Sequence, residues 1–161
     1  EKAAAQSSVE IAEASGIKEA LAIPYHNLGK YYDEIKDYKN SAKYFKKAVA
    51  NFEKFPPQKH NRQAVIADIK GHLYAALYRT GDKSALDKAE AALQQLKRSR
   101  ENSYNKNVWL SGAHLRIAEM LHEDNSRLAK THLKEAAKII SADKRLILRK
   151  HQLEEMLSSW K

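Results

Sequence analysis

The sequence predicts an all-α protein, an α-solenoid of about three and a half antiparallel helix pairs that form one domain over residues 1–161. Three observations favour this fold. Only five glycines and three prolines interrupt a chain rich in strong helix formers such as Ala, Lys, Glu and Leu. Apolar residues recur at helical spacing. Similar segments also return at offsets of about 40 to 44 residues, which indicates repeated helix pairs.

The clearest pair lies in residues 25–48, which predict two short helices joined by a tight turn at residues 36–37. The Asp37 carboxylate is expected to accept orphan backbone N–H groups at the start of the second helix. One face of the first helix consists of Tyr25, Leu28, Gly29 and Tyr32. One face of the second helix consists of Tyr38, Phe45 and Ala48.

Other helices follow from apolar stripes and breaks. Ser15-Gly16 and residues 80–82 and 123–125 predict turns, and the prolines in residues 55–61 predict the clearest break. Asn61 and Asn125 or Ser126 are expected caps. We expect helices at residues 1–14, 17–34 (with Pro24 kinking it or starting its regular part), 38–54, 64–79, 85–96, 109–121 and 127–140, and a last helix capped by Ser141 and running to about residue 160. Its apolar seam should pack on Leu133 and Ile140 and consists of Leu146, Leu153, Leu157 and Trp160.

The unit at residues 25–48 resembles the tetratricopeptide repeat, a family with a large aromatic residue, Leu-Gly, Tyr, a turn, and small and aromatic residues on the second helix. Two features depart from the family pattern: Ser41 stands where Ala is usual, and no Pro closes the unit at the usual distance after Ala48. The 40- and 44-residue offsets exceed the basic 34-residue repeat, so the chain is similar to the extended repeats of some bacterial regulators.

No catalytic, cofactor or metal motif is found in the sequence, so we expect a protein that is not an enzyme and has no cofactor. Seven histidines are scattered, and no two stand three or four residues apart on one predicted helix. We therefore expect them on the surface or in a binding groove. Cysteine is absent, which removes disulfides and thiol chemistry.

The resemblance implies that a partner binds on the concave face, which the first helix of each pair lines. Tyr78 is expected there as an exposed aromatic anchor, with charged neighbours orienting the partner. The positions that the resemblance assigns to this groove are His26, Lys30, Asp33, Asp68, Tyr78, Leu115, Glu119 and His122. The Lys and Asn with which some relatives grip a terminal carboxylate are replaced by His26 and Lys30, which argues against that activity.

The net charge of +9 is uneven, at −3 over residues 1–35, +7 over 36–125 and +5 over 126–161. This pattern favours solvated Lys-rich helix faces over a nucleic-acid site. The first hypothesis is a protein- or peptide-binding scaffold. The alternatives are a regulatory segment of a larger bacterial signalling protein and a weak nucleic-acid binder. We expect no membrane span, a cytoplasmic rather than periplasmic location, and a fragment of a longer chain, since residue 1 is Glu.

Overall fold

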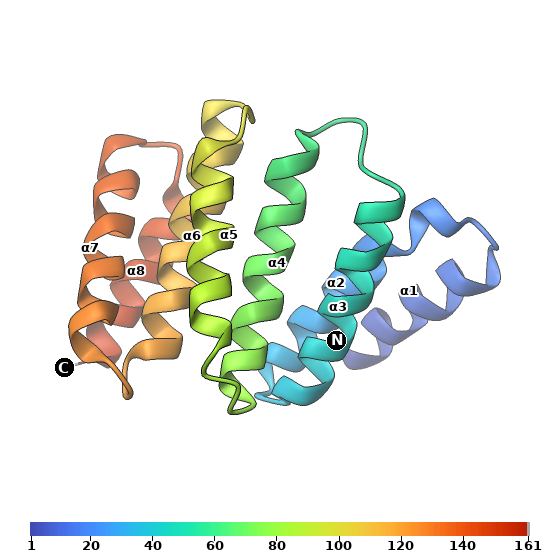
Figure 1. The fold of residues 1–161 in the computed structure, drawn as a ribbon, viewed down its shortest axis with the longest axis horizontal. Coiled ribbons are helices and arrows are strands. Elements are labelled where there is room, and N and C mark those ends of the chain that lie inside the picture. Colours follow the sequence, from blue (N-terminus) through green and yellow to red (C-terminus); the bar gives the residue numbers. More distant parts are fainter. Residues whose placement is uncertain (161) are drawn as a thin grey trace.

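The structure, a computed structural model, describes residues 1–160, which form eight α-helices and one short 3₁₀ helix without any strand (Figure 1). The all-α prediction is confirmed. Within these residues no helix combines the length and the apolar content needed to cross a membrane. The elements in chain order are α1 (Lys2–Ala14), η1 (Lys18–Ala20), α2 (Ala22–Glu34), α3 (Tyr38–Lys54), α4 (Arg62–Arg79), α5 (Ala85–Arg98), α6 (Ser103–Leu121), α7 (Ser126–Ala142) and α8 (Ile147–Ser159).

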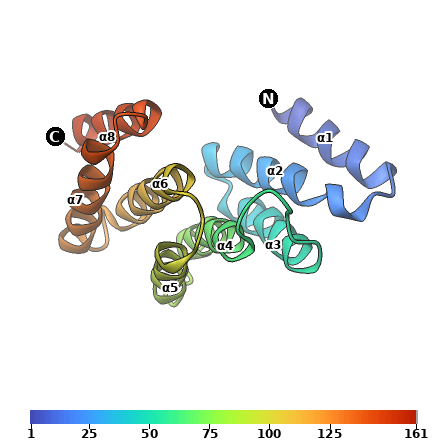
Figure 2. The same ribbon diagram turned by 90° about the horizontal axis from the view of Figure 1, so that it is seen from above.

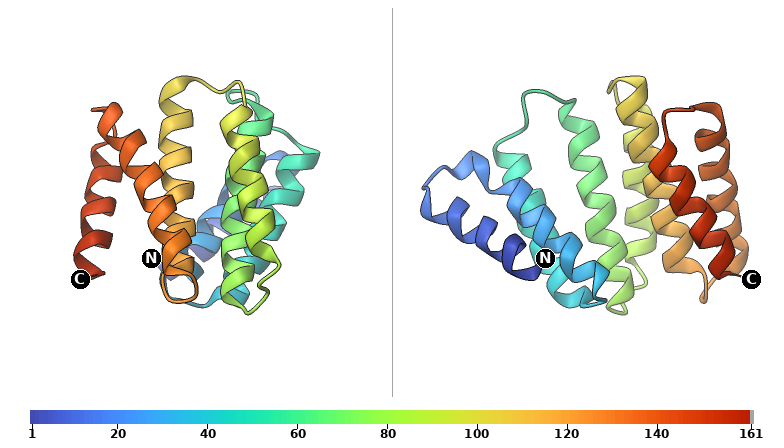
Figure 3. Two further views of the ribbon diagram at one scale, coloured as in Figure 1. Left: turned by 60° about the vertical axis from the view of Figure 1, so that its left-hand side comes forward. Right: turned by 180° about the vertical axis from the view of Figure 1, so that it is seen from behind.

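Successive helices alternate in direction, and each packs against the next along the chain (Figures 1 and 3). Seen from above, α2, α4, α6 and α8 form an inner row, while α3, α5 and α7 lie outside it (Figure 2). Contacts also join α4 to α6 and α6 to α8, so the inner row is continuous there. This packing between neighbours is consistent with a helical repeat.

The positions that recur in the sequence are the ones that the fold buries. Phe45 of α3 corresponds to Ala89 of α5 and Leu133 of α7, and all three are buried. The same holds for the next equivalent set, which consists of Ala48, Ala92 and Ala136. The buried residues form three apolar clusters that share partly buried neighbours such as Trp109 and Trp160. Each outer helix therefore uses small or apolar residues at the same two positions to pack on the inner row.

The contact between α2 and α3 depends on Gly29. A Cβ atom at this position would lie only 2.7 Å from Cδ1 of the Phe45 ring, whose side chain is 1% exposed. Ser41 is fully buried, and its Oγ donates a hydrogen bond of 2.9 Å to the Gly29 carbonyl oxygen. The departure from Ala at position 41 is thus accommodated, because its hydroxyl has a partner inside the core.

Local signals placed most helix starts correctly. The side chains of Asp37, Asn61 and Asn125 accept N-cap hydrogen bonds from the backbone N–H groups three residues later, at 3.1 to 3.2 Å. Gly16 and Gly81 have positive φ angles of 69° and 108° in the predicted turns. Asn102 is a further cap that accepts from Asn105 N–H at 2.9 Å, so α6 begins six residues earlier than predicted.

Two helix boundaries differ from the prediction. Ser141 does not cap the last helix but lies inside α7, and α8 begins only at Ile147. Asp143 explains the break, because its carboxylate accepts hydrogen bonds from the backbone N–H and the guanidinium of Arg145, at 2.7 to 3.1 Å. The predicted helix over residues 17–34 is divided: Lys18–Ala20 is a 3₁₀ turn, and Pro24 lies in the first turn of α2, where its missing N–H costs no helical bond.

The apolar seam predicted for the last helix is correct at three of its four residues, since the partly buried Trp160 also packs against the cluster of Leu133 and Ile140. Leu146 and Leu153 are buried in one cluster with Leu133 and Ile140, as expected. Leu157, however, is 44% exposed. No neighbouring helix of the described residues follows α8, so its far side stays at the surface.

Candidate functional site

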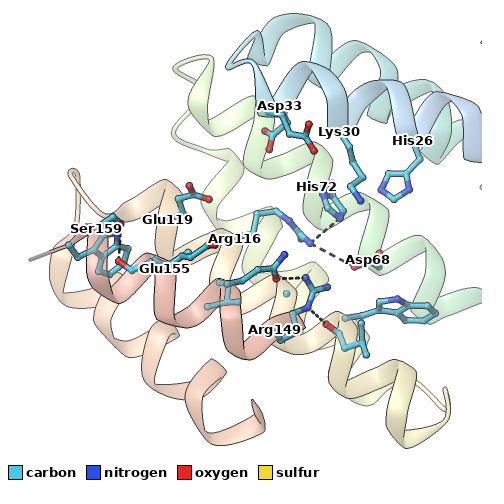
Figure 4. A pocket seen from close by; sticks show the side chains of 18 residues that line it. His26, Lys30, Asp33, Asp68, His72, Arg116, Glu119, Arg149, Glu155 and Ser159 are labelled. Carbon is cyan, nitrogen blue, oxygen red and sulfur yellow. Dashed lines mark hydrogen bonds and ion pairs between the residues drawn. The ribbon is translucent and has the colours of Figure 1, made fainter. Parts of the chain in front are cut away.

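A cavity of about 640 Å³ opens between α2, α4, α6 and α8 (Figure 4). Its wall includes apolar side chains such as Trp109, Leu115, Met156 and Trp160. The charged side chains and histidines of the wall come from all four helices of the inner row and are His26, Lys30, Asp33, Glu34, Asp68, His72, Arg116, Glu119, Arg149 and Glu155. The cavity is therefore a polar site with apolar patches, assembled from segments far apart in the sequence.

Helical spacing explains how each helix presents several side chains to this cavity. Residues three or four apart share one face of a helix. On α4, Asp68 and His72 are four residues apart, and on α6 the same spacing separates Gly112 and Arg116. Each inner helix thus contributes a stripe of polar residues, while its opposite side enters the apolar core.

Arg116 lies at the centre of the site. Its Nη2 is 3.0 Å from Nε2 of His72 and 3.9 Å from Oδ1 of Asp68 (Figure 4). The side chains of Arg116 and Asp68 are 16% and 15% exposed, so both charges are largely removed from water. Burial, aided by nearby cations such as Arg116, lowers the pKa of His72 well below 6.5. His72 is therefore neutral and accepts the arginine hydrogen bond through Nε2.

Arg149 enters the cavity from α8. Its Nε donates to the Val108 carbonyl oxygen at 3.0 Å, and its Nη1 donates to Oε1 of Gln152 at 2.7 Å. The guanidinium lies against Gly112, where a Cβ atom would come within 2.5 Å of Nη2. Glycine at this point of α6 leaves room for the guanidinium, which would have to shift if a side chain were added.

Arg116 has the same relation to Gly71 of α4 as Arg149 has to Gly112 of α6. A Cβ at Gly71 would lie 3.1 Å from Arg116 Nη1. In both cases an arginine from one inner helix reaches the glycine of the preceding inner helix. The absence of a side chain at the two glycines therefore lets two guanidinium groups lie close to the helix surfaces that form the cavity wall.

His26 approaches the same centre from α2. Its ring centroid is 5.0 Å from that of His72 and 5.6 Å from that of Phe45. Burial, with smaller contributions from Lys30 and Arg116, lowers the pKa of His26 to about 4. Its Nε2 is buried and has no hydrogen-bond partner among residues 1–160. A neutral ring with one unsatisfied nitrogen is thus part of the wall.

The other end of the cavity is acidic. Asp33, Glu34, Glu119 and Glu155 lie there, and Glu119 Oε2 is 3.7 Å from Nη2 of Arg79. Burial raises the pKa of Asp33, while Arg79 opposes this rise. This end has more carboxylates than cations to balance them.

The structure brings together six of the eight predicted groove residues: His26, Lys30, Asp33, Asp68, Leu115 and Glu119 line the cavity. The prediction for Tyr78 is wrong. Tyr78 is 5% exposed in the core, because α6 packs directly on α4 and covers this side of it. The Tyr78 hydroxyl donates to Oδ2 of Asp124 at 2.7 Å, and Lys83 Nζ lies 4.1 Å from the ring centroid. His122 stacks on Trp160 at 4.0 Å and does not line the cavity.

Three central residues were missed by sequence reasoning: His72, Arg116 and Arg149. A signal existed for the first two, since His72 and Arg116 lie four residues after the inner-face positions Asp68 and Gly112. No sequence signal pairs His26 with His72, or Arg149 with Gly112, because these contacts join different helices.

A second polar cluster lies between α5, α6 and α7, away from the cavity. His114 Nδ1 is 2.9 Å from His132 Nδ1, and His132 Nε2 is 2.5 Å from Oε1 of Glu90. His132 is 5% exposed, so the prediction that the histidines lie on the surface or in a groove is wrong for this residue. Burial is the main cause that lowers the pKa of His114 to about 4. Among residues 1–160 no group of three or more His, Asp or Glu side chains could hold a metal ion.

No protein-family model matches the chain, and no curated protein sequence matches it. The fold and the site define an all-α protein with a polar cavity on the inner side of its helix row. The volume lies within the range of about 300–1,000 Å³ that is typical of ligand pockets. Its wall offers hydrogen-bond donors, acceptors and both signs of charge to a ligand.

Proposed function

We propose that this chain is a non-catalytic binding module, a tetratricopeptide-like helical repeat that holds a segment of a partner protein in the cavity between α2, α4, α6 and α8. One observation carries the proposal: four helices turn charged side chains and histidines into one cavity. In the deeper part of this wall the charged side chains of Arg116 and Asp68 are largely buried, which a helix row that served stability alone does not need.

The free-energy cost of this wall supports a binding role. Removing charged groups from water is unfavourable, and a buried ion pair is often no more stable than an apolar pair of the same size. Arg116 and Asp68 are nevertheless largely buried, and His26 Nε2 lacks a partner among the described residues. Departures of this kind from a stable core are expected at functional sites.

The size and composition of the wall favour a peptide segment. Trp109, Trp160 and Met156 provide apolar area for a few partner side chains, and Trp and Arg are the residues most enriched at binding hot spots. The cavity spans the inner row from α2 to α8, so an extended segment can touch all four helices.

The close fit of Phe45 on Gly29 and the equivalent buried positions of α3, α5 and α7 support the tetratricopeptide-like interpretation. Residues 25–48 have the aromatic, Leu-Gly and small positions of that repeat. The inner row is then the surface on which such repeats place their ligands.

A regulatory role is a second candidate, because the cavity is shared by helices at distant points of the row. A ligand that contacts both α2 and α8 favours the arrangement in which these helices are correctly spaced. Binding would then change the shape that an attached domain senses. Nucleic acid fits the cavity poorly, since five carboxylates line it against three Lys and Arg side chains.

Selection from a random displayed peptide library tests the proposal. Peptides selected on the wild-type protein are titrated against Gln152→Trp, which fills the cavity, and against Gln94→Trp, which places the same residue on the exposed side of α5. We expect Gln94→Trp to bind like the wild type and Gln152→Trp to lose about tenfold or more in affinity, which is about 1.4 kcal/mol. Equal binding to both variants would place the peptide site elsewhere.

A further inference from the structure

We propose that the segment bound in the cavity carries opposite charges in a fixed direction, with an acidic residue beside Lys30, Arg116 and Arg149 and a basic residue beside Asp33, Glu119 and Glu155. This inference rests on the proposed peptide-binding function and specifies which peptides the cavity accepts. It follows from how the charges are distributed along the cavity.

Three of the four inner helices, α2, α6 and α8, place a cation before a carboxylate along the chain. All four run in one direction, from top to bottom in Figure 1. On α2, Lys30 precedes Asp33 by three residues, and on α6 Arg116 precedes Glu119 by three. On α8, Arg149 precedes Glu155 by six. Because the helices are parallel, the cations gather toward one end of the cavity and the carboxylates toward the other.

The close view shows this separation directly. In Figure 4, Glu119 and Glu155 lie on the left of the cavity, and Arg149 and Lys30 lie on the right. Asp33 lies between these two groups at the top of the view, and Asp68 lies on the right, where Arg116, Arg149 and Lys30 are the charges that act on it. This end therefore keeps an excess of positive charge.

The histidines do not alter this balance. His26 and His72 lie nearest to the cations, and burial lowers the pKa of both. Both rings are consequently neutral at pH 7 and add no charge to either end. They supply hydrogen-bonding nitrogens beside the arginines instead, one of which, His26 Nε2, has no partner among residues 1–160.

Arg149 has bonding capacity left for a ligand. Its Nε and Nη1 atoms donate to Val108 and Gln152, which are uncharged partners. No carboxylate of residues 1–160 lies within ion-pair distance of its guanidinium, although a guanidinium has five N–H donors. A carboxylate of the ligand would complete the charge-assisted bonds that this arginine lacks.

Helix dipoles strengthen the same polarity. The C-terminal ends of α2, α6 and α8 all point toward the acidic end, and each carries a partial negative charge. Of the three N-terminal ends, which carry partial positive charge, only that of α8 lies beside a cation of the cavity, Arg149. The dipoles therefore favour a basic ligand group at the carboxylates and an acidic group at Arg149.

The geometry also sets the separation of the two ligand charges. At a rise of about 1.5 Å per residue, Arg116 and Glu119 are about 4.5 Å apart along α6, and Arg149 and Glu155 about 9 Å apart along α8. An extended peptide advances about 3.3 Å per residue. The acidic and basic residues of the ligand should therefore stand about one to three residues apart.

A ligand with a single sign of charge meets repulsion at one end of the cavity. A polyanion such as a nucleic acid faces the four carboxylates of the acidic end, and a purely basic peptide faces the two arginines. Charge complementarity of this kind mainly fixes specificity and register.

The test compares selected peptides with their charge-neutralised forms. Peptides that bind the wild type and not Gln152→Trp are synthesised with the acidic residue changed to its amide, or the basic residue changed to glutamine. Each form is titrated against Lys30→Gln, Arg149→Gln and Glu155→Gln, with Lys130→Gln on the exposed side of α7 as the matched control. Lys30 and Glu155 are exposed, so their variants are expected to fold, and circular dichroism verifies this.

We expect neutralising the acidic peptide residue to weaken binding to the wild type and Lys130→Gln by about tenfold, which is about 1.4 kcal/mol. The loss should fall below about threefold, or 0.7 kcal/mol, on Lys30→Gln or Arg149→Gln. Neutralising the basic peptide residue should also weaken binding about tenfold to the wild type and Lys130→Gln, and by less than about threefold to Glu155→Gln alone. Cavity-dependent peptides that tolerate both neutralisations overturn the charge pattern and leave the proposed function standing. A selection that yields no cavity-dependent peptide overturns both.

Discussion

Replacing Gly29 with alanine tests the close contact between α2 and α3. This contact positions α2, which forms one side of the cavity. The added Cβ would meet Cδ1, Cε1 and Cγ of Phe45 at 2.7, 2.8 and 3.1 Å. The Phe45 ring is buried and also packs against His26 and His72, so it has little room to move. Gly71→Ala is the matched control, because its Cβ would meet only the end of the Arg116 side chain at 3.1 Å.

Two free-energy terms determine the outcome. Alanine is favoured over glycine inside a helix by about 0.8–1.0 kcal/mol, and this gain applies equally to α2 and α4. Overpacking a rigid contact costs about 1–3 kcal/mol, which applies at Gly29 and hardly at Gly71. Gly29→Ala should therefore destabilise the fold by about 0–2 kcal/mol, whereas Gly71→Ala should stabilise it by up to about 1 kcal/mol. The helix term cancels in the comparison, which leaves a difference of about 1–3 kcal/mol.

Guanidinium chloride unfolding, followed by far-ultraviolet circular dichroism, measures both variants. The comparison is valid if the dependence of the unfolding free energy on denaturant is the same for both, since that slope reports the surface exposed. If Gly29→Ala proves as stable as Gly71→Ala, then Phe45 does not pack on Gly29 as described. The tetratricopeptide-like pairing of α2 with α3 would then lose its main support.

Two further predictions concern Tyr78 and His26. Tyr78→Ala should destabilise the fold by about 3–5 kcal/mol, as for other buried aromatic residues, and leave peptide affinity unchanged. Denaturant unfolding measures the stability and titration measures the affinity. Unchanged stability with weaker peptide binding would show that Tyr78 is an exposed anchor. The pKa of His26 is about 4 in the fold against 6.5 for an unburied histidine, so the folded state excludes a proton that the unfolded chain accepts. The wild type should therefore lose stability relative to His26→Gln as the pH falls from about 6.5 to about 4. Burial raises the pKa of Asp33 and Asp68, so these carboxylates change the stability in the opposite direction, but they do so in both proteins and cancel in the difference. A stability difference that does not change with pH would contradict the buried, neutral state of His26.

The success and failure of the sequence predictions have the same physical origin. Asp37 and Asn61 were assigned as caps because a cap bonds to the backbone three residues away, which is a local interaction. The face of α4 that carries Asp68 was also correct, since helical period fixes which residues share a side. Tyr78 was placed wrongly because the period does not say which neighbouring helix covers a given side.

By itself, the sequence determined most of the helices, caps and turns, the repeated buried positions of α3, α5 and α7, and the inner row of polar residues. These features depend on interactions three or four residues apart, which composition and spacing record. Only the tertiary structure decided that Arg116 lies against Gly71, that Arg149 lies against Gly112, and that His26 faces His72. These partners are more than thirty residues apart, and the angles at which helices pack bring them together. The same packing aligned charges from three helices into one cavity with a cationic and an acidic end.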